Sequence, residues 1–139
     1  MNSGEYRENL RHGGTLVVNQ RGWSIKYYFA GPDLRYDGEF ITISSSNVPT
    51  FIIAFKNNYK KLQELKKTIP IGGNFDIIGE CGMHIGLGSF YGVTIAKWYN
   101  HLSNGNIPVK NESDLTIVIT YYEYCIKKAE EIKNLLFNN

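Results

Sequence analysis

The side chains best suited to acid–base chemistry lie in the second half of the chain, where Glu80, Cys81 and His84 stand close together and His101 follows. Imidazole and carboxylate groups can exchange protons with a substrate, and a thiol beside an imidazole can act as a nucleophile. A small nuclease or hydrolase that uses His84, His101 and Glu80 is therefore one hypothesis. Residues three apart on a strand point to opposite faces, which weakens a pairing of Cys81 with His84.

Metal and phosphate sites have weaker support. Cys81 and His84 have a C-x-x-H spacing, and His101 and Cys125 could complete four zinc ligands. Cys125, however, falls on the apolar stripe of a predicted helix, where a cysteine behaves as a small hydrophobe. The glycines between Gly79 and Gly92 match neither phosphate-loop spacing, and a strand pattern follows them instead of a helix. We therefore expect no metal and no cofactor.

Aromatic and acidic side chains are better placed to contact another protein. Asp37 and Glu39 fall on a predicted hairpin and could meet a basic groove on a partner. Tyr121 and Tyr124, with Ile117, form a second flank of a predicted helix, and clustered exposed aromatics often mark binding sites. Alternatively, this flank packs on the edge of the sheet or on the N-terminal arm. The predicted partner-binding residues are Tyr36, Asp37, Glu39, Trp98, Tyr121 and Tyr124.

Two kinds of hydrophobic periodicity predict the strands and helices that would position these residues. Alternation over residues 22–29 and 36–44, around a Gly31-Pro32-Asp33 turn, predicts a hairpin. Strand patterns return at 75–78, 83–87 and 90–99.

Helical spacing covers residues 47–69, where Asn47 is a plausible N-cap, and a second segment that begins at Asn111 or Ser113. The apolar residues of this second segment step by three and four: Leu115, Val118, Tyr122, Cys125, Ala129, Ile132 and Leu136.

The order of elements predicts an α+β fold in which two helices cover one face of an antiparallel sheet. Hairpin-length connections favour antiparallel over parallel pairing. We expect a flexible N-terminal arm at residues 1–13 and a single domain at residues 14–139, because the first segment is polar and the length fits one domain.

Composition limits the classes of function. The chain has 139 residues with 42% hydrophobic and 20% charged residues, which are the proportions of a globular protein. A net charge of +2 is too balanced to favour nucleic acid as a direct partner. We find neither a signal-peptide pattern nor a run of apolar residues long enough to cross a membrane, so we expect a cytoplasmic protein.

The chain resembles a known class of inhibitors in its polar start, its alternating hairpin GWSIKYYF (residues 22–29), its Asn/Lys/Ile-rich composition and its closing helix YYEYCIKKAEEI (residues 121–132). These features are similar to those of the small immunity proteins that are encoded beside toxin tips in bacterial contact-dependent growth inhibition systems. The resemblance implies a cytoplasmic inhibitor without catalytic activity that binds one toxin, often a nuclease. Many inhibitors of nucleases in this class are acidic, whereas this chain is mildly basic.

From the sequence we therefore expect an immunity protein that covers the active or substrate-docking face of its toxin. Two other classes of function stay open beside it. One is the small nuclease or hydrolase described above, and the other is a homo-oligomeric regulatory module that uses the second helix as its interface.

Overall fold

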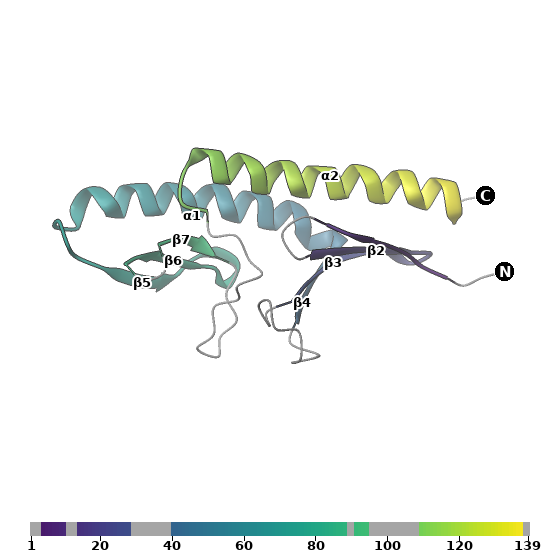
Figure 1. Cartoon of the computed structure of the whole chain (residues 1–139), viewed down its shortest axis with the longest axis horizontal. Helices are drawn as coiled ribbons and strands as arrows, with labels where there is room; N and C mark the ends of the chain where they lie inside the picture. Colours follow the sequence, from purple (N-terminus) through teal and green to yellow (C-terminus); the bar gives the residue numbers. More distant parts are fainter. Residues whose placement is uncertain (1–3, 11–13, 29–39, 89–90, 95–108, 138–139) are drawn as a thin grey trace.

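The computed structural model of the chain describes residues 4–10, 14–28, 40–88, 91–94 and 109–137. These residues form two antiparallel sheets and two long helices, in the order strands, helix, strands, helix (Figure 1). The α+β class and the order of elements predicted from the sequence are therefore confirmed. The strands are β1 (Tyr6–Asn9), β2 (Gly14–Asn19), β3 (Gly22–Tyr28), β4 (Phe40–Ser44), β5 (Phe75–Ile78), β6 (His84–Leu87) and β7 (Gly92–Thr94). The helices are α1 (Val48–Thr68) and α2 (Glu112–Leu136), with short 3-10 turns η2 (Ser45–Asn47) and η3 (Glu80–Gly82).

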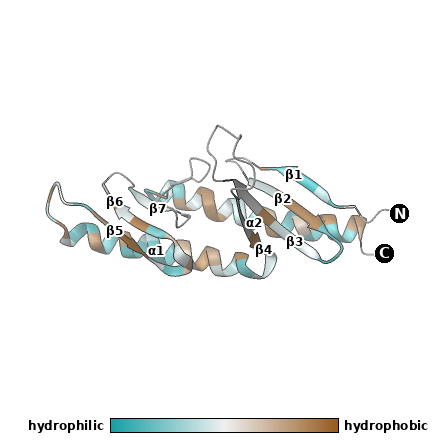
Figure 2. Ribbon diagram, turned by 90° about the horizontal axis from the view of Figure 1, so that it is seen from below, coloured by the Kyte–Doolittle hydropathy of each residue, from teal (hydrophilic) through white to brown (hydrophobic). Residues whose placement is uncertain are grey.

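The strands divide into two sheets, where the sequence predicted one. The first has the order β1-β2-β3-β4 and the second the order β5-β6-β7, and every neighbouring pair is antiparallel. The cause is the length of α1, which at a rise of ~1.5 Å per residue carries the chain about 30 Å from β4 before β5 begins. Figure 2 shows the two sheets side by side, in front of the helices.

The two helices lie on the same side of both sheets (Figure 1), whereas the sequence predicted them on one face of a single sheet. Helix α1 runs from the first sheet to the second and packs on β6 and β7. Helix α2 returns in the opposite direction, packs along α1 and extends over β2 and β3. The molecule is therefore elongated, and the sheets contribute to one hydrophobic core through the helices that they share.

Helix α2 buries the stripe that its sequence predicts. Its buried positions are Val118, Tyr122, Cys125, Ala129 and Ile132, which face Leu16, Val18 and Ile25 of the first sheet as part of one core. The ring of Tyr122 lies 6.0 Å from that of Phe55 on α1, so an aromatic pair joins the two helices. None of the helices in the described parts of the chain is long and apolar enough to cross a membrane.

The ends of the helices match the predicted caps in part. The side chain of Asn111 accepts a hydrogen bond from the amide of Asp114 at 2.9 Å, so Asn111 caps α2. Asn47 stands at the cap position of α1, but its side chain donates a hydrogen bond to the hydroxyl of Ser44 and makes no capping bond to the helix.

Part of the predicted arm belongs to the first sheet. Tyr6–Asn9 form β1, the edge strand of that sheet, which pairs with β2 so that Glu8 is opposite Leu16. Tyr6, Glu8 and Leu10 are half-buried, whereas Arg7 and Asn9 are exposed. The polar composition of this segment hid an alternation with a period of two, which is the pattern of a strand with one covered face.

Candidate partner-binding groove

A groove of about 560 Å³ lies between the edge strand β1 and the first half of α2. Its lining combines apolar, aromatic and hydroxyl side chains with one carboxylate. The lining residues are Glu8, Asn9, Leu10, Thr116, Ile117, Thr120, Tyr121 and Tyr124. A mainly apolar groove with a few placed polar groups is the usual form of a binding site.

Two regular spacings build the groove. The period of two along β1 turns Glu8 and Leu10 to the side that α2 covers. On α2, Ile117, Tyr121 and Tyr124 are separated by four and three residues, so they share one flank of the helix. This flank is beside the buried stripe, and the side chains of Ile117 and Tyr124 are 44% and 45% exposed. The apolar wall of the groove is therefore open to solvent.

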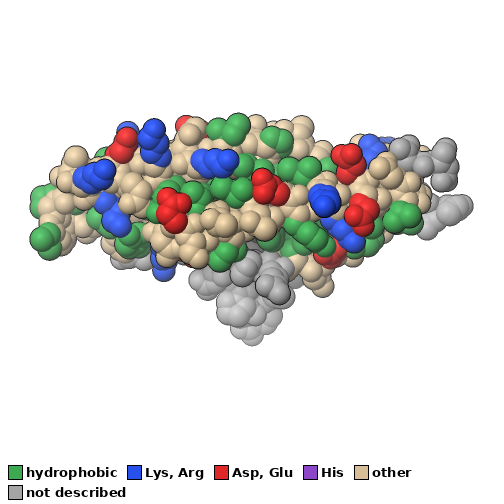
Figure 3. Space-filling model, turned by 90° about the horizontal axis from the view of Figure 1, so that it is seen from above, with side chains coloured by type: hydrophobic (Ala, Val, Ile, Leu, Met, Phe, Trp, Pro, Cys, Tyr) green, Lys and Arg blue, Asp and Glu red, His purple; other side chains and the backbone are tan. Residues whose placement is uncertain are grey.

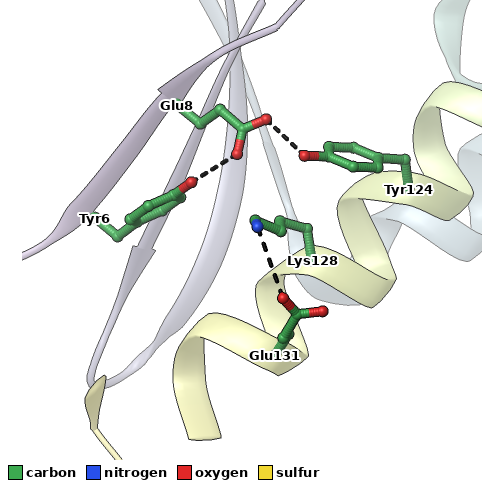
Figure 4. A network of polar contacts seen from close by, with 5 residues as sticks. All are labelled: Tyr6, Glu8, Tyr124, Lys128 and Glu131. Atoms are coloured by element: carbon green, nitrogen blue, oxygen red, sulfur yellow. Dashed lines mark hydrogen bonds and ion pairs between the residues drawn. The ribbon is translucent and has the colours of Figure 1, made fainter. Parts of the chain in front are cut away.

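One carboxylate connects the two walls of the groove. The hydroxyl of Tyr6 donates a hydrogen bond to Oε1 of Glu8 at 2.6 Å, and the hydroxyl of Tyr124 donates to Oε2 at 2.7 Å (Figure 4). Lys128 lies nearby on α2 and its Nζ is 3.6 Å from Oε1 of Glu131. The carboxylate of Glu8 is thus held in one position by phenols from two different elements.

The same contacts set the ionisation of these groups. The hydrogen bond from Tyr6 lowers the pKa of Glu8, and the bond from Tyr124 and the charge of Lys128 act in the same direction against partial burial. The hydrogen bond to Glu8 is also the main cause that raises the pKa of Tyr124 to about 12 and that raises the pKa of Tyr6. At neutral pH, Glu8 is therefore an anion between two neutral phenols.

Of the residues predicted to bind a partner, the structure brings together Tyr121 and Tyr124, with Ile117 beside them. The contact of Tyr124 with Glu8 is the predicted packing of this flank on the N-terminal segment. The flank is also partly exposed, so a role in binding a partner stays a prediction. The other four predicted residues lie outside the described residues: Tyr36, Asp37, Glu39 and Trp98. Figure 3 shows hydrophobic side chains between scattered charges of both signs on the helical face of the molecule.

Glu8 is the residue of this site that sequence reasoning missed. Its polar neighbours place it in the predicted flexible arm, and the sequence predicts no contact for Glu8 itself. The signal was present in the alternation of Tyr6, Glu8 and Leu10 with Arg7 and Asn9. The contact of Glu8 with Tyr124 joins residues 116 apart in the sequence, and no local pattern reports it.

The predicted acid–base residues have separate partners in the structure. Nδ1 of His84 is 2.9 Å from Oδ1 of Asp76, on the neighbouring strand β5. Both oxygens of Glu80 accept from Nδ2 of Asn57, at 3.1 and 3.2 Å. His101 and His12 lie outside the described residues.

The turn that carries Glu80 and Cys81 is fixed from α1 by a buried amide. Asn58, which is only 2% exposed, accepts from the amide of Glu80 at 2.9 Å and donates to its carbonyl at 3.1 Å. Cys81 takes a left-handed conformation with φ of 57°. Desolvation, with a smaller contribution from the charge of Glu80, raises the pKa of its thiol, which disfavours the thiolate that a nucleophile needs.

The described residues contain no group of three or more His, Cys, Asp or Glu side chains that could hold a metal ion. Cys125 is buried on α2, where burial raises the pKa of its thiol to about 12. It fills space in the core as a small apolar side chain.

Comparison of the chain with models of protein families, with curated proteins and with solved structures finds no match.

Proposed function

We propose that this chain is an immunity protein, which acts in the cytoplasm by binding a cognate toxin domain and covering its active or substrate-docking face. The observation that supports the proposal is the groove between β1 and α2, with its exposed aromatic wall and its fixed carboxylate. Tyrosine side chains in a partly enclosed apolar site are frequent hot spots of protein interfaces.

The openness of the groove favours a protein ligand. A pocket for a small molecule buries most of its ligand, whereas Ile117 and Tyr124 on the groove wall are 44% and 45% exposed. An ordinary interface covers ~800 Å² on each partner and depends on a few anchor side chains. Ile117, Tyr121 and Tyr124 are the proposed anchors. They lie on α2, and side chains on a formed helix need less backbone ordering on binding than side chains on a loop.

A nuclease domain is the toxin class that we propose first. Nucleases carry cationic side chains that bind phosphates, and an inhibitor can meet such groups with carboxylates. The chain as a whole is slightly basic, so this complementarity must be local, and the anionic Glu8 in the groove provides it.

The test is co-expression and pull-down of the chain with the product of the neighbouring reading frame. Ile117→Lys places a charge on the groove wall, and Ile78→Lys is the matched control, because Ile78 is 63% exposed on β5 of the other sheet. We expect the wild type and Ile78→Lys to bind and protect, and Ile117→Lys to lose at least about tenfold in affinity. A neighbouring product that is harmless in cells, or that does not bind the wild type, would contradict the proposal.

A small nuclease or hydrolase is the second candidate, and the contact between His84 and Asp76 is the observation in its favour. A carboxylate that orients an imidazole can prepare it as a general base. Glu80, its proposed companion, is engaged by Asn57 instead. Substitution of His84, His101 and Glu80 by alanine would decide the matter, since retained biological activity would dismiss the enzyme.

A further inference from the structure

We propose that the groove receives an extended segment of the partner protein, which adds as a further strand to the open edge of β1 and presents a Lys or Arg to Glu8. This inference rests on the proposed function, since it names the binding mode and the chemistry of the partner at the same site. Three features of the described residues carry it: the hydrogen-bonding edge of β1, the wall formed by α2, and the position of the carboxylate.

The register of β1 turns one of its edges away from β2, and no described strand pairs with that edge. The amide of Leu10 donates to the carbonyl of Gly14 at 2.8 Å, so Leu10 is in a hydrogen-bonded pair. Such pairs alternate along an antiparallel ladder, and the unbroken register therefore turns the backbone groups of Glu8 toward β2 and those of Arg7 and Asn9 away from it. No strand in the described parts of the chain pairs with that outward edge.

The groove reaches this edge at Asn9, which lines it together with Glu8 and Leu10. Its lining includes both Glu8 and Asn9, whose side chains lie on opposite faces of β1. Helix α2 packs over β2 and β3, and its residues Ile117 and Tyr121 line the groove together with residues of β1. A strand in this position would bond to the amides and carbonyls of Arg7 and Asn9 and would direct alternate side chains against α2.

The carboxylate specifies a cation on the added strand. Glu8 accepts one hydrogen bond on each oxygen from a neutral phenol, whereas a carboxylate has about four acceptor positions. The carboxylate of Glu8 is therefore fixed in position and can accept a further hydrogen bond. A Lys or Arg among apolar residues that alternate along the strand would fill the apolar wall and pair with Glu8.

The competing explanation is that Glu8 and the shortness of β1 protect the edge from pairing. Native proteins guard edge strands with short lengths and with charges that point inward. The two explanations make opposite predictions for Glu8→Gln. If Glu8 protects the edge, Glu8→Gln should promote self-association of the chain. If Glu8 binds the partner, Glu8→Gln should weaken the binding of a cationic peptide.

The test uses random linear dodecapeptides displayed on phage and selected on the full chain. Clones that also bind Ile117→Lys are removed, and Ile78→Lys serves again as the matched control. Each selected sequence is then synthesised in three forms: unmodified, and N-methylated at either of the two alternating sets of backbone amides. Strand addition uses only one of these sets, so each peptide provides its own control.

We expect the selected peptides to carry Lys or Arg among alternating apolar residues and to slow hydrogen exchange at the amides of Arg7 and Asn9. One N-methylated form should lose at least about tenfold in affinity and the other should stay close to the parent, and Glu8→Gln should weaken binding by about tenfold. The inference is overturned if no peptide discriminates against Ile117→Lys, if both N-methylated forms bind alike, or if Glu8→Gln dimerises in light scattering with unchanged peptide affinity.

Failure of this inference can be told apart from failure of the proposed function. A toxin that binds the wild type and Ile117→Lys equally would leave an immunity protein whose interface lies elsewhere, and the strand addition would be wrong. A neighbouring product that binds neither protein would remove the immunity function, and the peptide selection would then decide alone whether β1 accepts a strand.

Discussion

Removal of the Tyr124 hydroxyl should uncouple β1 from α2 without disturbing the core. Tyr124→Phe keeps the ring that lines the groove and deletes the 2.7 Å hydrogen bond to Glu8. The bond is the largest of several causes, burial among them, that together raise the pKa of Tyr124 from 10.0 to about 12. At ~1.36 kcal/mol per unit the whole shift corresponds to about 2.7 kcal/mol, of which the bond supplies only a part. That figure is an upper value because the side chain is 45% exposed and water screens the interaction. We therefore expect a loss of about 1 kcal/mol, or about 3 °C in Tm.

A double-mutant cycle with Glu8→Gln isolates this interaction. Urea unfolding at pH 7 of the wild type, both single variants and the double variant should give a coupling free energy of about 1 kcal/mol. The matched control is a cycle between Glu8→Gln and Tyr91→Phe, because the hydroxyl of Tyr91 contacts Lys66 and not Glu8. That cycle should be additive within about 0.5 kcal/mol. A Tyr124 cycle that is equally additive would refute the reasoning.

The coupling should also depend on pH with a definite sign. The folded-state pKa of Glu8 is below its ordinary value of 4.5, so its contribution is present above that value and is lost as the pH falls through the folded-state pKa. The raised pKa of Tyr124 gives the opposite behaviour at high pH, since its contribution is present below pH 10.0 and is lost as the pH rises toward about 12. The coupling should be flat between these limits, and a coupling that grows below pH 4.5 would contradict the assignment.

Three further predictions concern the second sheet and the cysteines. Asn58→Ala removes the buried amide that holds Glu80, and it should lower the free energy of unfolding in urea by about 2–3 kcal/mol. A loss below about 1 kcal/mol would show that the turn is stable without this amide. Gly92→Ala places a Cβ 2.8 Å from the carbonyl oxygen of Val109 at a φ of 125°, so its Tm should fall by more than about 5 °C, and an unchanged Tm would contradict this. In the native protein, a thiol reagent at pH 8 should label the exposed Cys81 slowly and leave Cys125 unlabelled until denaturant is added, so rapid labelling of Cys125 in the native protein would contradict its burial.

The helices could be predicted from the sequence because each is determined by its own periodicity. The spacing placed the first helix at residues 47–69, and α1 spans Val48–Thr68. The stripe of α2 from Val118 to Ile132 is buried as its steps of three and four require. The two ends of the predicted stripe differ, because Leu115 is only half-buried and Leu136, at the last residue of the helix, is exposed.

The division into two sheets and the groove could not be predicted from local patterns. Alternation shows that a segment is a strand, but it does not say which other strand it pairs with. That pairing follows from the path of the chain along α1, which separates β4 from β5. The groove depends in the same way on α2 returning over the first sheet, which brings Tyr124 to Glu8.

The return of α2 over the first sheet also has a consequence for synthesis of the protein. Residues 14–44 leave the ribosome well before residues 112–136, yet the apolar face that includes Leu16 and Ile25 is covered by α2. The apolar side chains of these strands therefore stay exposed until nearly a hundred more residues have been translated. At ~5–20 residues per second, this takes about 5–20 seconds. Nascent chains halted within this interval should be the ones that chaperones capture.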